Sequence, residues 1–460
     1  MKNRGLNVSM ALVMFLTWVA WPGVMDAKPQ QEEHGWFALL SGDPDKAAEL
    51  ESRLKNGATP EELNLPSGTT ESQSFRTLTE LKQEDAQAKD TYPVKVTPPV
   101  KINNQWVPPR FTYDFISKGE CLERAESGRD EGWIKNHYAW CRSKIVSYGE
   151  IKWNPFPRVY QINFRITEIG YGTNSQDPEK EEREVHFDYY IDDIYVSHPS
   201  LNGTKLKVDI DCQALVQPED CKEKGGAVER TIAQWKVHNK ASKTLYSTPP
   251  PRTDTNPERL GFMEFFTHME IDPPANLPSR ALDSPKQKVR WDSADYMIVV
   301  NPNQRFYNAG IFSNVRPVIH FSLSNPSVMR EQAQHIKDAL ESPETTFPYP
   351  GVGKIIPGGT YEMPLSRMKN QSDIRRNRRR SQYWCRKLSR DGVLPRPANS
   401  ECDEFPFAST WQGTYTGGVG KFSVRYISAD SNRAGGNWLA AWYAYDRILN
   451  NDPFNVRVIE

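Results

Sequence analysis

The sequence predicts a multidomain protein, in which a β-rich, antiparallel, sandwich-like middle domain is followed by a smaller α+β domain. Three observations lead to this prediction. The chain has 460 residues, which is enough for two or three domains of ordinary size. Its middle part consists of short runs in which apolar and polar residues alternate, as in strands with one buried face. Its last part combines such runs with stretches of helical apolar spacing.

The first 27 residues have the pattern of a secretory signal peptide. Lys2 and Arg4 give a positively charged start, residues 10–21 are apolar and uncharged, and Ala27 is a candidate cleavage position. The apolar stretch is shorter than the ~18 to 20 residues that a membrane-spanning helix needs. An uncleaved anchor or a buried helix is the competing interpretation. We expect a secreted, extracellular protein without stable membrane insertion.

Residues 28–104 are acidic, rich in proline and poor in aromatic side chains. One short helix at 45–54 is predicted, with Asp45 as its cap. The remainder has the composition of a linker or propeptide.

Residues 105–326 form the predicted β-rich domain. Turn signals such as Asn202–Gly203 separate several of the alternating runs. Together these runs favour an antiparallel sandwich of roughly 200 residues. One helix is expected at 132–141. No motif in this domain indicates its role. The expected strands lie at 158–166, 187–194, 205–210, 296–300 and 318–323.

The six cysteines are grouped along the chain into three close pairs, namely Cys121/Cys141, Cys212/Cys221 and Cys385/Cys402. Six cysteines permit ~15 connectivities, and local pairing is the most economical one. A zinc site is the competing interpretation, but no pair has the C-x2-C spacing of a zinc ribbon. We therefore predict three local disulfides, as expected in an oxidising compartment.

Lys+Arg and Asp+Glu each total 58, so the net charge indicates no particular partner. Its local distribution is more informative, because residues 371–390 hold seven Arg and one Lys against the single acid Asp373. A helix beginning at Asp373, with Ser372 as its cap, would project Arg375, Arg378 and Arg379 from neighbouring turns. Guanidinium groups bind phosphate oxygens in a bidentate way. A solvated helix face is the alternative.

An acidic motif follows this basic stretch. Residues 402–410 read C-D-E-F-P-F-A-S-T, which resembles the C-D-E-Y-P-F-A-S-T signature of the secreted NucA/NucB deoxyribonucleases, with Phe405 in place of Tyr. The resemblance covers roughly 125 residues and implies that residues 327–460 are an α+β nuclease domain whose substrate is DNA and whose cofactor is Mg²⁺ or Mn²⁺. Further family-like elements stand in order at 335–339, 373–378, 429–436, 442–448 and 451–454.

Hydrolysis of a phosphodiester needs an activated water and compensation of the added negative charge, and carboxylates that hold a divalent metal supply both. We expect Asp403 and Asp430 to be metal ligands and Glu404 to be a base or a supporting group. A salt bridge to the basic helix is the competing interpretation for Glu404. The family's Glu–Asn step is Asp430–Ser431 here, and Asn432 stands one residue later as the candidate amide.

Three smaller expectations concern the same domain. His335 is its only histidine and therefore the one candidate for a histidine-based mechanism; a position on a helix surface is the competing interpretation. A strand at 422–427 would carry Asp430 to the end of a sheet. Asn437 is expected to cap a helix at 438–447, and a last strand is expected at 454–458.

The leading functional hypothesis is a secreted endonuclease that hydrolyses DNA with a divalent metal. A second hypothesis is an antagonism toxin in which the β-rich domain is a binding or delivery module, with an immunity or inhibitor protein as a further partner. A third is a nucleic-acid-binding protein whose catalytic centre has decayed, as the change at Asp430–Ser431 would allow.

Overall fold

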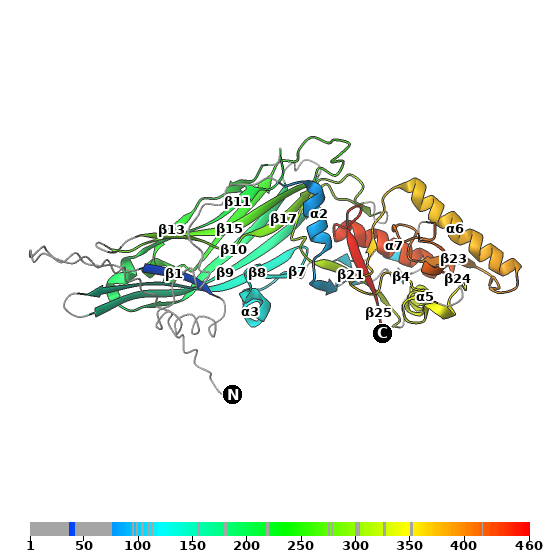
Figure 1. Cartoon of the computed structure of the whole chain (residues 1–460), viewed down its shortest axis with the longest axis horizontal. Coiled ribbons are helices and arrows are strands. Elements are labelled where there is room, and N and C mark those ends of the chain that lie inside the picture. The colour runs from blue at the N-terminus through cyan, green and yellow to red at the C-terminus, as the bar shows by residue number, and fades with distance from the viewer. Residues whose placement is uncertain are drawn as a thin grey trace, which may run out of the picture.

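The structure is a computed structural model and describes residues 36–41, 76–93, 96–97, 100–102, 105–107, 110–111, 114–153, 157–177, 183–217, 220–274, 277, 279–299, 304–324, 328–349, 353–415 and 417–460. The predicted signal peptide and the predicted helix at 45–54 lie outside these residues. The described chain has a long β-rich part and a helix-containing part at opposite ends of its long axis (Figure 1).

The β-rich part is a single sheet of 13 strands, with the order β12-β14-β10-β9-β20-β17-β15-β11-β13 and with β1, β7, β8 and β16 beside this path. Its strands are β1 (Trp36–Ser41), β7 (Trp133–Asn136), β8 (Ala139–Trp153), β9 (Pro157–Ser175), β10 (Arg183–Val196), β11 (Lys205–Ala214), β12 (Lys222–Lys224), β13 (Val228–Thr231), β14 (Lys240–Ser247), β15 (Gly261–Asp272), β16 (Arg280–Asp283), β17 (Gln287–Asp292) and β20 (Asn308–Ile311).

The sheet curls so that its two halves face each other across one core. Trp140 of β8 and Phe187 of β10 lie with their rings 4.9 Å and 4.7 Å from the ring of Phe265 in β15. Strand β20 pairs with β9 on one side and with β17 on the other, and so joins the halves. The strands are therefore antiparallel as predicted, but among the described residues they form one curled sheet instead of the two separate sheets of a sandwich.

Residues 132–141 are a β-hairpin and not the predicted helix. Strand β7 pairs with the start of β8, with Trp133 opposite Cys141. The turn between them is stabilised by Asn136, whose side-chain oxygen accepts a hydrogen bond from the backbone N–H of Tyr138 at 2.9 Å. Burial of Tyr138 and Trp140 in the sheet outweighs the helical spacing of the local sequence.

Several short elements lie outside the 13-stranded sheet. Helix α2 packs through Leu81 against Phe262 and neighbouring residues, and its Asp85 forms an ion pair with Lys288 of β17 at 2.6 Å. Of the predicted strand at 296–300, the described residues 296–299 contain the two-residue strand β18. These elements are α2 (Leu78–Ala86), α3 (Lys118–Glu123), α4 (Ile232–Val237), β3 (Val96–Thr97), β4 (Val100–Ile102), β5 (Gln105–Val107), β6 (Arg110–Phe111), β18 (Ile298–Val299) and β19 (Gln304–Arg305).

A second sheet unites segments that are far apart in the sequence. Its order is β2-β21-β25-β22, with β2 (Thr91–Pro93), β21 (Arg316–Ser322), β22 (Leu365–Ser366) and β25 (Pro453–Ile459). Strand β21 pairs in parallel with both β2 and β25. Ile319 and Phe321 of β21 share one apolar core with residues of the C-terminal helices. The sheet of the C-terminal part therefore includes strands that precede residue 327.

Three helices and a hairpin complete the C-terminal part, which is α+β as expected. They are α5 (Arg330–Glu341), α6 (Gln371–Arg390), α7 (Ala429–Tyr445) and the hairpin of β23 (Ser400–Phe405) and β24 (Ser423–Ser428). Helix α6 begins two residues before the predicted start, because the side chain of Asn370 accepts hydrogen bonds from Ser372 N–H and Asp373 N–H.

Helix α7 begins at Ala429 and not after Asn437. Ser428 is its N-terminal cap and accepts a hydrogen bond from the N–H of Ser431. The consequence is that Asp430 and Asn432 lie in the first turn of a helix, where the sequence predicted the end of a strand.

The two parts of the chain meet in a buried seam. Arg447, after α7, donates from Nη2 to Asp292 of β17 at 2.6 Å, and both side chains are fully buried. An apolar cluster crosses the same seam and includes Met297 and Phe306 from the β-rich part and Ala444 from α7. Helix α2 lies between the two parts (Figure 1). Of the helices in the described ranges, none has the length and apolar character required to span a bilayer.

The three disulfides join Cys121 to Cys141, Cys212 to Cys221 and Cys385 to Cys402. The predicted local pairing is confirmed.

Candidate active site

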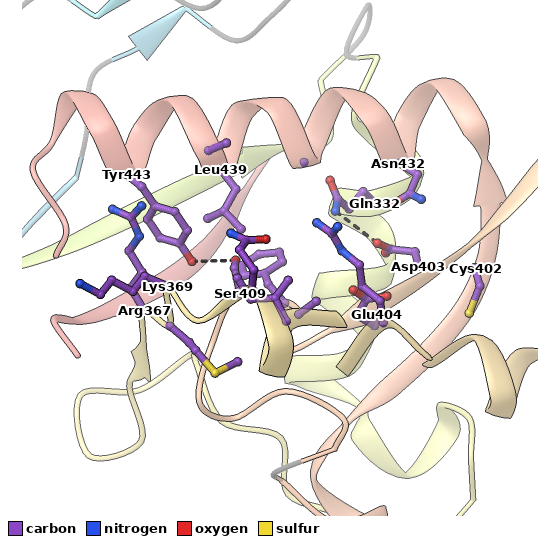
Figure 2. A pocket seen from close by; sticks show the side chains of 18 of the residues that line it. Gln332, Arg367, Lys369, Cys402, Asp403, Glu404, Ser409, Asn432, Leu439 and Tyr443 are labelled. Carbon is purple, nitrogen blue, oxygen red and sulfur yellow. Dashed lines mark hydrogen bonds between the residues drawn. The ribbon is translucent and has the colours of Figure 1, made fainter. Parts of the chain in front are cut away.

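A pocket of about 440 Å³ lies beside helix α7, between that helix, α6 and β23. Figure 2 shows its two ends, with Asp403, Glu404 and Asn432 at one and Arg367, Lys369 and Tyr443 at the other. Most of the lining comes from the C-terminal part, but Tyr296 and Ile298 of the β-rich part also line the pocket.

Strand alternation explains how adjacent carboxylates reach different surroundings. Successive side chains of a strand point to opposite faces. Asp403 accordingly faces α5, where it contacts Gln332 and His335. Its neighbours Cys402 and Glu404 face α6, to which Cys402 is joined by the disulfide with Cys385. The hairpin is thus held between helices on both of its faces.

Asp403 is only 3% exposed, and two donors from one face of α5 hold its carboxylate. His335 Nδ1 lies 2.6 Å from Oδ2, and Gln332 Nε2 donates to Oδ1 at 3.3 Å. The other ring nitrogen of His335 lies 2.8 Å from the hydroxyl of Ser423. Since a carboxylate only accepts, Nδ1 of His335 carries the proton. Both nitrogens of His335 therefore have protein partners, and this histidine orients Asp403.

Glu404, at the same end of the pocket, has a pKa well above the ordinary value for a glutamate. Burial and the adjacent Asp403 raise the pKa of Glu404 to about 7, against the lowering effects of Arg378 and Ser381. Glu404 therefore exchanges a proton near neutral pH, as a general acid or base must do.

Asn432 lies at the acidic end of the pocket, while Asp430 does not. The amide of Asn432 donates to Glu401 Oε2 at 3.0 Å, and its side chain is among those that line the pocket. Asp430 is exposed in the first turn of α7 and, among the described residues, is not part of the lining. The structure thus brings together Asp403, Glu404 and Asn432.

One side of the basic helix α6 lies along the pocket. Arg378 lines the pocket, and Arg375 and Arg379 are exposed beside it. Because each residue of an α-helix is rotated by about 100° from the one before, Arg375 and Arg379 both lie on the same side of Arg378 around the helix axis. Within the described residues none of the three forms an ion pair, whereas Arg376 on the opposite flank pairs with Asp373 at 3.1 Å.

The donors at the acidic end fit a hard divalent cation. Besides the two carboxylates, they include the side-chain oxygen of Asn432, which lines the pocket and whose amide nitrogen is bound to Glu401. Within the described ranges, no three His, Cys, Asp or Glu side chains are grouped as they would be in an all-protein metal cage. Mg²⁺ commonly binds through one or two carboxylates, water and substrate phosphate, so the donor set suits such an ion.

Sequence reasoning missed Gln332 and gave His335 no specific partner. His335 is fully buried, so the competing interpretation of a helix-surface residue is wrong. Both belong to one face of α5, three residues apart, and their spacing is the signal that could have placed them beside a common partner.

The fold and the pocket define a class of site in which paired carboxylates lie beside a row of arginines, which suits the cleavage of a phosphodiester. The comparison with known families is more specific. Residues 356–457 match the family model described as Deoxyribonuclease NucA/NucB. This match confirms the resemblance for the C-terminal part, which it covers from before α6 into β25. No curated protein matches the chain.

Proposed function

We propose that the protein is a secreted endonuclease that hydrolyses phosphodiester bonds of DNA with a divalent metal ion. The observation that carries the proposal is the juxtaposition, in one pocket, of Asp403, Glu404 and the arginine flank of α6. The family match at 356–457 supports DNA as the substrate. The three disulfides support an oxidising compartment and hence secretion.

Each residue then has a distinct role. Asp403 and Asn432 hold Mg²⁺ or Mn²⁺, which when bound neutralises charge on the phosphate and acidifies water. His335 and Gln332 fix the rotamer of Asp403 through the two hydrogen bonds described above. Glu404 accepts the proton of the attacking water. Asp430, the second ligand predicted from the sequence, is tested by substitution below.

The arginines act on the substrate and not on the reacting water. Arg378 contacts the phosphate being cleaved, because its guanidinium shares the pocket with Glu404. Arg375 and Arg379 bind phosphates further along the same strand. Such contacts hold the nucleic acid in register without reading its sequence.

The proposed domain division places the nuclease at 327–460 and the β-rich domain at 105–326. Strands β2 and β21 complete the nuclease sheet from outside that range. Experiments therefore require the full chain.

The test is magnesium- and manganese-dependent nicking of a plasmid by the full chain, before and after addition of EDTA. We expect Asp403→Asn to lower cleavage by about 100-fold or more, by analogy with losses at metal sites. Asp391→Asn is the matched control, because Asp391 is an exposed acid at the end of α6. Asp430→Asn separates the two ligand assignments. Loss of metal binding in calorimetry would place Asp430 in the metal site. Unchanged binding would favour Asp403 and Asn432 as the metal ligands.

A wild-type chain that binds DNA but leaves the plasmid intact with either metal would contradict the proposal. That result would favour the decayed nucleic-acid-binding protein instead.

A further inference from the structure

The end of the pocket opposite Asp403 contains two cations stacked on aromatic rings. The guanidinium of Arg367 lies 4.5 Å from the ring centroid of Tyr443 and 4.9 Å from that of Tyr296. Lys369 Nζ lies 4.5 Å from the same Tyr296 ring. Tyr296 precedes strand β18 and belongs to the β-rich part, so this end of the pocket is built by both parts of the chain.

Hydrogen bonds fix the tyrosine ring and the backbone of this end. The hydroxyl of Tyr296 donates to Glu258 and accepts from the backbone N–H of Asn450 at 2.9 Å. The backbone N–H of Lys369 donates to Asn450 Oδ1 at 3.0 Å. Arg367 Nη1 donates to the carbonyl oxygen of Ile448. The arrangement is therefore set before any ligand binds.

Neither cation is neutralised by direct contact with an acid. Among the described residues, no carboxylate lies within ion-pair distance of Arg367 or Lys369. Asp452 and Glu258 interact with Arg367 at longer range, but each already has a cationic partner. Asp452 pairs with Arg290 at 2.9 Å, and Glu258 pairs with Lys82 at 3.1 Å and accepts from the hydroxyl of Tyr296. An anionic group would supply the missing partner. A nucleobase is disfavoured here, because the rings of Tyr296 and Tyr443 already have cations over them.

Helix α7 extends from one end of the pocket to the other, so its rise gives the distance between the two ends. Asn432 lines the acidic end and Tyr443 the basic end. They are separated by roughly 16 Å along a helix that rises about 1.5 Å per residue. Neighbouring phosphates of one strand are only about 3.4 Å apart along a duplex axis. The pocket is thus long enough for more than one nucleotide, and one phosphate cannot occupy both ends.

We infer that Arg367, Lys369 and Tyr296 form a second phosphate subsite, which the β-rich part and the C-terminal part build together. It holds a phosphate of the strand being cut, at a distance from the bond that reacts. This inference rests on the proposed function and extends it, because it makes the β-rich part a component of the substrate site.

The test compares Lys369→Gln with Lys421→Gln in the full chain. Lys421 is an exposed lysine of the same part of the protein that does not line the pocket, so the control removes the same charge elsewhere. Binding of a 5′-labelled 12-nucleotide DNA strand is measured by fluorescence polarisation in EDTA at several salt concentrations. Lys369→Gln should weaken binding about tenfold, as expected for a charged hydrogen bond. Its salt slope should fall by about 0.7, the value for one phosphate contact of a single strand.

Steady-state cleavage of the same strand gives an independent measure. Lys369→Gln should raise KM and leave kcat within about twofold, because its phosphate is not the one that reacts. Asp403→Asn should instead lower kcat.

The contribution of the β-rich part to the phosphate subsite is tested with two variants of Tyr296. Tyr296→Leu removes both the ring and the hydroxyl and should repeat the effect of Lys369→Gln on affinity. Tyr296→Phe keeps the ring but loses the hydroxyl bonds to Glu258 and Asn450, so its affinity should lie between those of Tyr296→Leu and the wild type. Thermal melting identifies a variant that fails to fold, and in that case the lysine comparison alone decides.

Several results would overturn the inference. If the wild type binds and cuts DNA while Lys369→Gln behaves as Lys421→Gln does, the subsite is wrong and the proposed function stands. A folded Tyr296→Leu with wild-type affinity would remove the β-rich part from the subsite. If the wild type neither binds nor cuts DNA, the proposed function fails and the subsite with it.

Discussion

Removal of the carboxylate of Asp292 is expected to destabilise both parts of the protein together. Asp292 receives three hydrogen bonds from Arg447, at 2.9, 3.0 and 2.6 Å, and both side chains are fully buried. Asp292→Ala leaves a buried guanidinium without its charged partner, and such a change costs about 3–5 kcal/mol of unfolding free energy.

The free-energy loss converts into a measurable shift. With an m-value of about 3 kcal/mol/M, the urea midpoint should fall by about 1 to 1.7 M. Unfolding is followed by tryptophan fluorescence, because the chain has 13 Trp residues. Asp295→Ala is the matched control. Asp295 pairs with Arg252 at the surface, with side chains 58% and 46% exposed, and such pairs contribute at most about 1 kcal/mol.

Two results would refute this reasoning. If Asp292→Ala lowers the midpoint no more than Asp295→Ala does, the buried pair contributes no more than a surface pair. If unfolding has two steps and only one of them shifts, the seam does not couple the stability of the two parts.

Three further predictions concern other parts of the molecule. Gly435→Ala would place a Cβ 1.2 Å from the Oε1 atom of Gln332 and displace that side chain from Asp403, the proposed metal ligand. Plasmid cleavage should therefore fall by about 10- to 100-fold. Burial raises the pKa of Asp446 to about 8, from about 4 in an unfolded chain. Because the folded state then binds more protons in this range, stability should fall as pH rises from about 4 to 8, and Asp446→Asn should flatten that slope in urea titrations at several pH values. Reduction of Cys385–Cys402, whose sequence separation is 17, should cost about 3 kcal/mol and lower cleavage before circular dichroism shows loss of the fold; unchanged cleavage after selective reduction would contradict this.

Local patterns in the sequence were sufficient for much of the C-terminal part. The arginine-rich stretch is the helix α6, and the acidic motif is a strand whose alternation separates Asp403 from Glu404. Close spacing of cysteines was enough to predict all three disulfides. These features depend on neighbours within about twenty residues, and short-range chemistry determines them.

Features that depend on tertiary packing were not predicted. The sequence places the start of α7 at Trp438 because Asn437 is a good capping residue, whereas the helix begins at Ala429 and contains Gly435 and Gly436. In the fold, the absence of a side chain at Gly435 leaves room for Gln332 from another helix, and this packing outweighs the local preference. The partners of His335 and the curl of the large sheet likewise depend on contacts between distant segments.

The pairing of β21 with both β2 and β25 has a consequence for biosynthesis. Strand β2 is made roughly 360 residues before β25, and the sheet cannot be completed until β25 has been translated. Pairing across such distances is slow compared with local contacts. A nascent chain that already contains α6 and the motif strand β23 still lacks Phe454, which packs against Trp442 in the core of that domain. We therefore expect translation intermediates that lack β25 to have no nuclease activity.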